Sequence, residues 1–138
     1  MAAFTKFYSL TEKLAQGVFN CATDDLKVYL TNNTPDPAGD INAGDLPEIA
    51  AVNGYDAGGK STANSVTTSL GVASVVAGTD VTWTATGPMG PFQYVVLYDD
   101  TVPGNPLIGY WAYPGGSITL QAGETFTVDF GTSMFTIT

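Results

Sequence analysis

The chain has 138 residues, of which 44% are hydrophobic and 12% are charged, and this length predicts one domain over residues 1–138. Its four basic residues stand against 13 acidic ones, for a formal net charge of -9. Because such a surface repels phosphate groups, we expect no nucleic-acid partner and no membrane partner. With one Cys and no His, the sequence excludes an intrachain disulfide and a Cys/His zinc site.

The first expected element is a short amphipathic helix over residues 4–16. The apolar pattern recurs at steps of three and four residues, through Phe4, Phe7, Leu10 or Thr11, and Leu14, which places these residues on one face. Gly17 is a plausible stop for this helix. The apolar face either packs on the rest of the fold or docks on a neighbouring subunit, and the pattern alone leaves both readings open.

A strand is expected at residues 26–31, where apolar side chains alternate with Lys27, Tyr29 and Thr31, which should face outward. Residues 32–45 read as a long polar loop, and residues 46–52 as a helical turn or a short strand. The later strands are expected at residues 60–70, 72–77, 81–86, 92–98, 107–113, 117–120, 125–130 and 133–138.

The central pair of strands is separated by the sequence GPMGP at residues 87–91, which should stop both strands and form a turn or short loop. Residues 121–124, QAGE, should form a hairpin turn, and Gly109 suggests a bulge or a close backbone approach. About eight short strands with Gly/Pro turns predict a mainly β fold. It would be an antiparallel β-sandwich, jelly-roll-like, or a partly closed barrel.

Residues 54–61, GYDAGGKS, match the pattern of a phosphate-binding loop. Such a loop must open a helix, but the residues after Ser61 are β-branched and favour a strand. A glycine-rich turn that leads into a strand is therefore the better interpretation. Asp40 and Asp45 sit in a segment that resembles a calcium loop, but Gly44 stands where the third oxygen ligand belongs. We expect no metal and no cofactor.

Catalysis by a nucleophile with a histidine base is impossible without histidine. A carboxylate pair could hydrolyse glycosides, and we expect no enzyme because the acids of the later strands read as turn or outward-facing residues. Those acids are Asp80, Asp99, Asp100, Glu124 and Asp129. Five aromatic residues could instead form a glycan platform, although core packing is the plainer interpretation. They are Tyr94, Tyr98, Tyr110, Trp111 and Tyr113.

Three blocks of the sequence together resemble a family of small virion structural proteins of tailed bacteriophages. The blocks are FTKFYSLTEKLAQGVFNCATDDLKVYLTNNTP, GYDAGG, and the segment from DVTWTATG to GETFTVDF. Several members of that family are described as head decoration, or cement, proteins. The resemblance implies a non-enzymatic protein on the capsid exterior, assembled in the host cytoplasm, with the major capsid protein and further copies of itself, as a trimer or dimer, as partners.

The expected contact with the capsid or a neighbouring subunit involves the apolar N-terminal segment or the acidic loop. Its candidate residues are Phe4, Phe7, Leu14, Asp36, Asp40 and Asp45. The N-terminus has no continuous apolar stretch of the kind found in signal peptides, and no run is long enough for a membrane span. The alternative function is a tail or fibre component whose β-sandwich binds carbohydrate.

Overall fold

The computed structural model describes residues 3–138 and is mainly β, with twelve strands and one α-helix, α1 (Ser9–Ala15). A single 3-10 turn, η1, covers Ala43–Asp45. The strands are β1 (Thr5–Lys6), β2 (Leu26–Thr31), β3 (Lys60–Ser61), β4 (Ser65–Ser69), β5 (Val72–Val76), β6 (Val81–Thr84), β7 (Met89–Phe92), β8 (Tyr94–Asp99), β9 (Leu107–Ala112), β10 (Ile118–Leu120), β11 (Thr125–Val128) and β12 (Phe135–Ile137).

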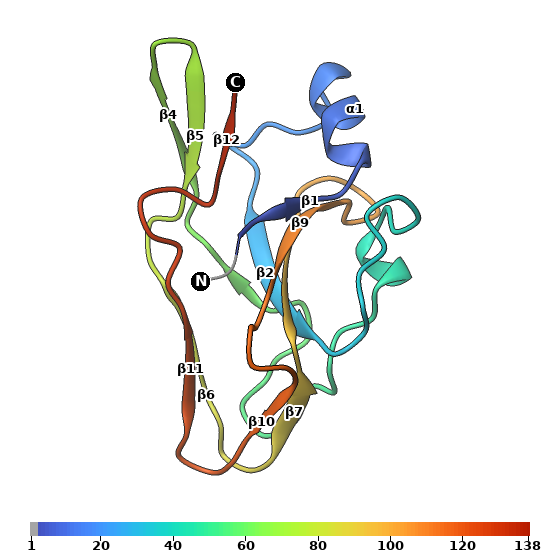
Figure 1. Ribbon diagram of the computed structural model, residues 1–138, viewed down its shortest axis with the longest axis vertical. Helices are drawn as coiled ribbons and strands as arrows, with labels where there is room; N and C mark the ends of the chain where they lie inside the picture. Colours follow the sequence, from blue (N-terminus) through green and yellow to red (C-terminus); the bar gives the residue numbers. More distant parts are fainter. Residues whose placement is uncertain (1–2) are drawn as a thin grey trace.

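The strands form two antiparallel layers that face each other like a sandwich (Figure 1). The first layer has the strand order β1-β9-β8-β2-β3, and the pair β7-β10 extends it because β7 runs into β8 and β10 follows β9. The second layer consists of the sheet β12-β5-β4 and the pair β11-β6, since β5 and β6 are consecutive along the chain. All the described pairings are antiparallel and the sheets do not close into a barrel. The expected β-sandwich is therefore confirmed, with more and shorter strands than the expected eight.

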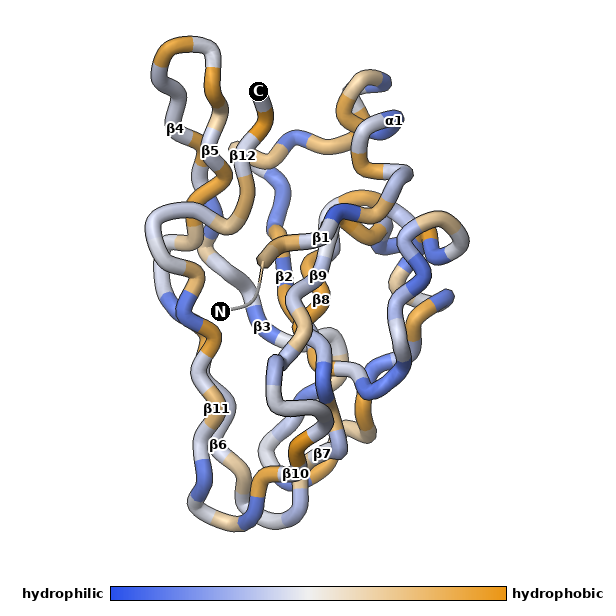
Figure 2. The backbone as a smooth tube through the Cα atoms, in the orientation of Figure 1, coloured by the Kyte–Doolittle hydropathy of each residue, from blue (hydrophilic) through white to orange (hydrophobic). Residues whose placement is uncertain are grey.

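Aromatic rings join the two layers in the core. Phe126 of β11 lies with its ring centroid 4.9 Å from that of Phe92 of β7, and Trp111 of β9 lies 5.5 Å from Phe130 after β11. Trp83 of β6, which is fully buried, stacks between the rings of Tyr55 and Phe126. Figure 2 shows hydrophobic residues interspersed with hydrophilic ones along the strands of both layers. Burial of these large rings is the main source of the stability of the sandwich.

The N-terminal segment differs from the expected helix over residues 4–16. Thr5 and Lys6 form strand β1 on β9, and the backbone N–H of Phe7 donates to the carbonyl of Ile108 at 3.0 Å. The helix α1 begins only at Ser9. Pairing with a distant strand satisfies the backbone and buries Phe7 completely, which the helical spacing of the apolar residues could not reveal.

The outward face of β2 is also buried, contrary to the expectation for Tyr29 and Thr31. Tyr29 is 2% exposed and Thr31 is 0% exposed. The loop after β2 folds back over them: the Tyr29 hydroxyl donates to the carbonyl of Leu46 at 2.7 Å, and the Thr31 hydroxyl donates to that of Pro47 at 2.6 Å. Residues 46–52 thus form a cover, without the expected helical turn or strand of their own.

Of the two turns expected near the centre, that at residues 87–91 is replaced largely by a strand, and that at residues 121–124 forms but does not join two paired strands. Residues 87–91 do not form a turn between two strands, because Met89–Phe92 is strand β7, paired with β10. Met89 and Phe92 are fully buried, and this burial outweighs the weak strand propensity of glycine and proline. Residues 121–124 do not close a hairpin, since β10 pairs with β7 and β11 pairs with β6. They form a corner where the chain crosses between layers.

The expectation for Gly109 is confirmed. Leu97 pairs with Gly109 while Tyr98 pairs with Leu107, so Ile108 is the extra residue of a bulge in β9. A Cβ atom on Gly109 would lie 2.1 Å from the ring atom Cζ of Phe4. The glycine therefore makes room for the ring with which the N-terminal segment enters the core.

Candidate interaction surface

The three apolar residues proposed for the interface lie at different depths. Phe7 is 0% exposed and packs against Tyr110, with 5.5 Å between the ring centroids. The assignment of Phe7 as a residue that touches a partner is therefore wrong, because its side chain belongs to the core. Phe4 and Leu14 are half-buried and keep part of their surface open.

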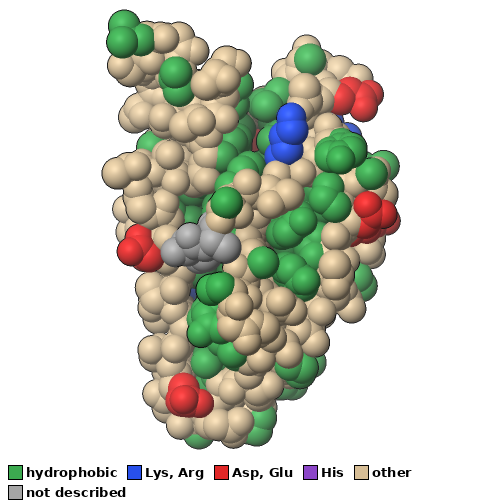
Figure 3. Space-filling model, viewed as in Figure 1, with side chains coloured by type: hydrophobic (Ala, Val, Ile, Leu, Met, Phe, Trp, Pro, Cys, Tyr) green, Lys and Arg blue, Asp and Glu red, His purple; other side chains and the backbone are tan. Residues whose placement is uncertain are grey.

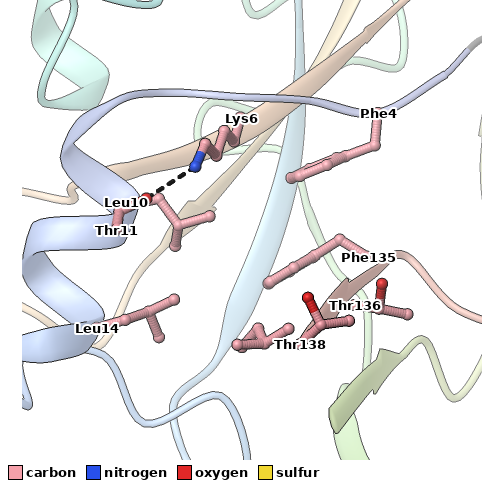
Figure 4. A pocket seen from close by; sticks show the side chains of 9 residues that line it. Phe4, Lys6, Leu10, Thr11, Leu14, Phe135, Thr136 and Thr138 are labelled. Atoms are coloured by element: carbon pink, nitrogen blue, oxygen red, sulfur yellow. Dashed lines mark hydrogen bonds between the residues drawn. The ribbon is translucent and has the colours of Figure 1, made fainter. Parts of the chain in front are cut away.

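Phe4 and Leu14 line a groove between α1 and β12, with a volume of about 510 Å³ (Figure 4). We call it the α1–β12 groove. Its floor includes Phe4 stacked on Phe135, with the ring centroids 5.0 Å apart and the planes 9° from parallel. Leu14 and Ile137 contribute further apolar walls. At its rim the Lys6 ammonium donates to the Thr11 hydroxyl at 2.9 Å, as the dashed line in Figure 4 shows.

The three acidic candidates lie on the loop after β2, where their carboxylates accept hydrogen bonds from the loop's own backbone. Asp40 Oδ2 accepts from the N–H of Asp36 at 2.8 Å. Asp45 Oδ2 accepts from the N–H groups of Asn42 and Ile41, at 3.0 and 3.1 Å, and these two bonds lower the pKa of Asp45. Within residues 3–138, no group of three acidic, His or Cys side chains is arranged to hold a metal ion.

The same loop is fixed to the N-terminal segment and to β9. The N–H of Tyr8 donates to the carbonyl of Pro37 at 2.9 Å, and the N–H of Leu107 donates to that of Ile41 at 2.8 Å. Tyr8 is 66% exposed and Ile41 is 44% exposed. We call Tyr8, Asp36, Ile41 and Asp45 the loop face. Figure 3 shows acidic and hydrophobic side chains next to one another on the side of the molecule that carries this loop.

The glycine-rich segment at residues 54–61 forms a turn into strand β3, as expected, and does not open a helix. Both carboxylate oxygens of Glu48 accept from the N–H of Gly58, at 3.0 and 3.1 Å, and Glu48 Oε1 also accepts from the Tyr55 hydroxyl at 2.8 Å. A carboxylate thus holds the amide that would otherwise face a phosphate. The segment supports β2: a Cβ atom on Gly59 would lie 1.8 Å from the carbonyl oxygen of Val28.

The acids considered for glycoside hydrolysis bind separate partners. Asp100 forms an ion pair with Lys27 at 3.0 Å, and Asp80 Oδ1 accepts from the N–H of Phe130 at 3.3 Å. Asp129 Oδ1 accepts from the N–H of Gly131 at 2.9 Å. Glu124 accepts from the N–H of Gln121 at 2.7 Å, within the corner between the layers. These four contacts shape turns and strand ends.

A carboxyl pair that the sequence did not single out is formed by Asp24 and Asp99. Asp99 is 0% exposed, and its Oδ1 accepts from the N–H of Thr101 at 2.9 Å, while its buried Oδ2 has no hydrogen-bond partner among residues 3–138. Burial, followed by the neighbouring carboxyl group of Asp24, raises the pKa of Asp99 to about 7. Burial and the charge of Asp99 also raise the pKa of the Cys21 thiol to about 11. The one sequence signal was the doubling of acids at residues 24–25 and 99–100.

The aromatic residues considered as a glycan platform are mostly structural. Tyr98 and Trp111 are 3% and 4% exposed. Tyr94 and Tyr110 are half-buried, in an edge-to-face pair with 6.0 Å between the centroids. Tyr113, at 37% exposed, is the most open of the five. Core and cross-strand packing therefore accounts for most of this set.

The fold class that these observations define is an antiparallel β-sandwich with one short helix. Comparison of the chain with models of protein families, with curated proteins and with solved structures gives no match. Within residues 3–138, no helix has the length and apolar character that crossing a membrane requires.

Proposed function

We propose that this chain is a structural, non-enzymatic virion protein that binds the outer surface of a tailed-phage capsid as a decoration protein. The resemblance of its three sequence blocks to such proteins supports the proposal. The structural observation that carries it is the loop face, which is exposed yet firmly held by backbone hydrogen bonds to neighbouring elements. A surface of this kind can bind a partner without a large loss of conformational entropy.

The chemistry of the loop face fits a protein partner with basic character. Tyr8 and Ile41 supply apolar area that a partner would cover, and Asp36 and Asp45 supply negative charge beside it. Charges of opposite sign on the shell would speed association and fix the orientation of binding. The proposed partners are the major capsid protein at this face and further copies of the same chain elsewhere.

The test is the number of copies of this protein in a purified virion, measured by quantitative mass spectrometry against the major capsid protein. We expect a simple ratio to the capsid protein, as regular coverage of a shell requires. A number far below the capsid copy number would place the chain in the tail or fibres, where the carbohydrate-binding alternative applies. Absence from the particle would contradict both virion roles.

A further inference from the structure

The turn of the β4–β5 hairpin contains a leucine whose backbone conformation and exposure no contact within residues 3–138 explains. Its two-residue turn consists of Leu70 and Gly71, with φ of 51° and 80°. A turn with both residues in the left-handed region favours Asn-Gly, because a branched side chain such as leucine is strained there. Leu70 is nevertheless 101% exposed and buries nothing within the molecule. A strained and fully exposed leucine indicates a residue selected for contact with a partner.

Strand β4 of the hairpin also leaves one edge exposed and unpaired. Strand β4 is the last strand of its sheet, and four of its five residues are exposed. Proteins usually protect such an edge with charged side chains, proline or a bulge. Here no charged residue and no proline occurs between Lys60 and Asp80. The unprotected edge is therefore consistent with a hairpin that is covered in an assembly.

An apolar site of suitable size lies at the same end of the molecule. In Figure 1 the β4–β5 hairpin, the C-terminal strand β12 and α1 all lie at one end of the long axis. The α1–β12 groove, with Leu10, Leu14, Phe135 and Ile137 among its lining residues, has a volume of about 510 Å³. Among its lining side chains Lys6 is the one with a charge, and none is acidic.

We propose that the tip of the β4–β5 hairpin, with Leu70 leading, inserts into the α1–β12 groove of a second copy of this chain. Two copies with a net charge of -9 each repel one another, so a stable contact requires surfaces without acidic side chains. The hairpin and the groove are such surfaces. Because both lie at one end, two copies facing each other exchange hairpins reciprocally around a two-fold axis.

This inference deepens the self-association in the proposed function and rests on it, but it does not depend on binding to a capsid. The experiment uses the whole purified chain and compares the wild type with Leu70→Asn, Leu14→Asn and Val52→Asn by light scattering and analytical ultracentrifugation. Val52 is 53% exposed and lies outside the hairpin and the groove, so it is the matched control.

We expect a wild-type dimer whose dissociation constant rises about tenfold or more in Leu70→Asn and Leu14→Asn and stays unchanged in Val52→Asn. Because asparagine suits the left-handed turn, Leu70→Asn should melt at the same temperature as the wild-type monomer or higher. Loss of association therefore cannot be attributed to unfolding. A wild type that stays monomeric, or a Leu70→Asn variant that associates as the wild type does, overturns the proposal.

Cross-linking tests the partner site directly. A copy carrying Leu70→Cys, mixed with a copy carrying Leu14→Cys and oxidised, should form a mixed disulfide dimer, whereas neither variant should cross-link with the wild type. The native Cys21 is buried, and the wild-type chain measures the background cross-linking that this residue contributes. Cross-linking of Leu70→Cys with itself at the same yield would indicate tip-to-tip contact and overturn the groove assignment. Association that depends on Leu70 without binding to capsids would leave this inference standing and contradict the capsid role.

Discussion

Asp99 is a carboxyl group whose protonation is linked to folding. It ends the buried strand β8 with no exposed surface, and the carboxyl group of Asp24 lies nearby. Its pKa rises from 3.8 to about 7, first because of burial and then because of Asp24. Since the folded state binds the proton more tightly than the unfolded state does, this contribution to stability is full below about pH 4. It is lost as the pH rises through about 7.

We expect Asp99→Asn to remove this pH dependence. Asparagine can still accept from the N–H of Thr101, and its neutral amide does not titrate. The free energy of unfolding of the wild type should fall by roughly 2 kcal/mol between about pH 5 and pH 8, whereas that of the variant should stay nearly level. Urea denaturation at several pH values measures the difference.

The neighbouring Asp100 gives the control for this experiment. Its carboxylate is partly exposed and pairs with Lys27 at 3.0 Å, so Asp100→Asn should keep the pH dependence of the wild type. A flat profile for Asp100→Asn, or an unchanged slope for Asp99→Asn, would show that another group carries the dependence.

Leu70 illustrates a conflict between a side chain and the backbone conformation that its position requires. Its left-handed backbone conformation costs about 1–3 kcal/mol in a residue other than glycine. No contact with the rest of residues 3–138 offsets this cost, since the side chain is fully exposed there. The sequence pattern predicted the two strands around the turn, but it could not show that leucine occupied a turn position that favours asparagine.

At the scale of an element, the segment formed by β1 and α1 places a core residue and an exposed residue next to each other in the sequence. Phe7 is fully buried against Tyr110, and Tyr8 is 66% exposed on the loop face. The same segment also supplies Phe4 to the contact with Phe135. Removal of the segment would therefore open the core, so point variants are the proper test of its surface.

We expect Phe7→Ala and Tyr8→Ala to have separate effects. Phe7→Ala should lower the free energy of unfolding by about 3–5 kcal/mol, because it leaves a cavity beneath β9. Tyr8→Ala should change the stability by no more than about 0.5 kcal/mol but should reduce the occupancy of capsids in a co-sedimentation assay. Chemical denaturation and sedimentation with shells that lack the protein measure the two effects.

Val52→Ala is the control for the surface effect, since Val52 is similarly exposed but lies outside the loop face. It should bind capsids as the wild type does. If Tyr8→Ala binds as well as Val52→Ala, the loop face does not contact the shell. If Phe7→Ala is as stable as Tyr8→Ala, the burial of Phe7 contributes much less than its position indicates.

The elements that were predicted well from the sequence are those whose own residue pattern is sufficient to identify them. The range of β2 is confirmed at Leu26–Thr31, and β5, β8 and β9 fall within a residue or two of the expected ranges. The errors arise where contact with a segment distant in the sequence determines the local structure or the burial of a residue. Met89–Phe92 contains glycine and proline and reads as a turn, yet pairing with β10 makes it a strand. The burial of Tyr29 depends on the loop that covers it.

The candidate surfaces were likewise predicted where the local sequence pattern is sufficient and missed where distant segments contribute. The spacing of apolar residues predicted that Phe4 and Leu14 share one apolar surface, and both line the groove. Phe135 and Ile137 complete it from the far end of the chain, and strand β12 reaches this place only through pairing with β5. The composition predicted an acidic loop, but it could not show that Asp40 and Asp45 bind the loop's own amides.

At the scale of the whole molecule, charge is distributed unevenly along the chain and between the layers. All four basic residues lie within the first 60 positions, so β4, β5, β6, β11 and β12 carry none. The net charge of -9 therefore opposes close approach of two copies. Salt screens this repulsion, whereas it leaves apolar contact intact or strengthens it.

We therefore expect self-association of the purified chain to strengthen as salt increases from about 50 to about 500 mM, where the Debye length shortens from about 14 to about 4 Å. Sedimentation velocity at a fixed protein concentration measures the dimer fraction. Leu70→Asn should remain monomeric across the series. Dissociation of the wild type by salt would instead indicate an interface held by opposite charges, and would count against the hairpin and the groove.

The two tryptophans give the sandwich an intrinsic optical probe for each layer. Trp83 lies on β6 of the second layer and is 0% exposed, while Trp111 lies on β9 of the first layer and is 4% exposed. Their rings have different aromatic neighbours, so single replacements by phenylalanine separate their fluorescence. If the layers share one cooperative core, the emission maxima of both tryptophans shift to longer wavelength at the same denaturant concentration. The emission spectrum then reports the integrity of the whole fold.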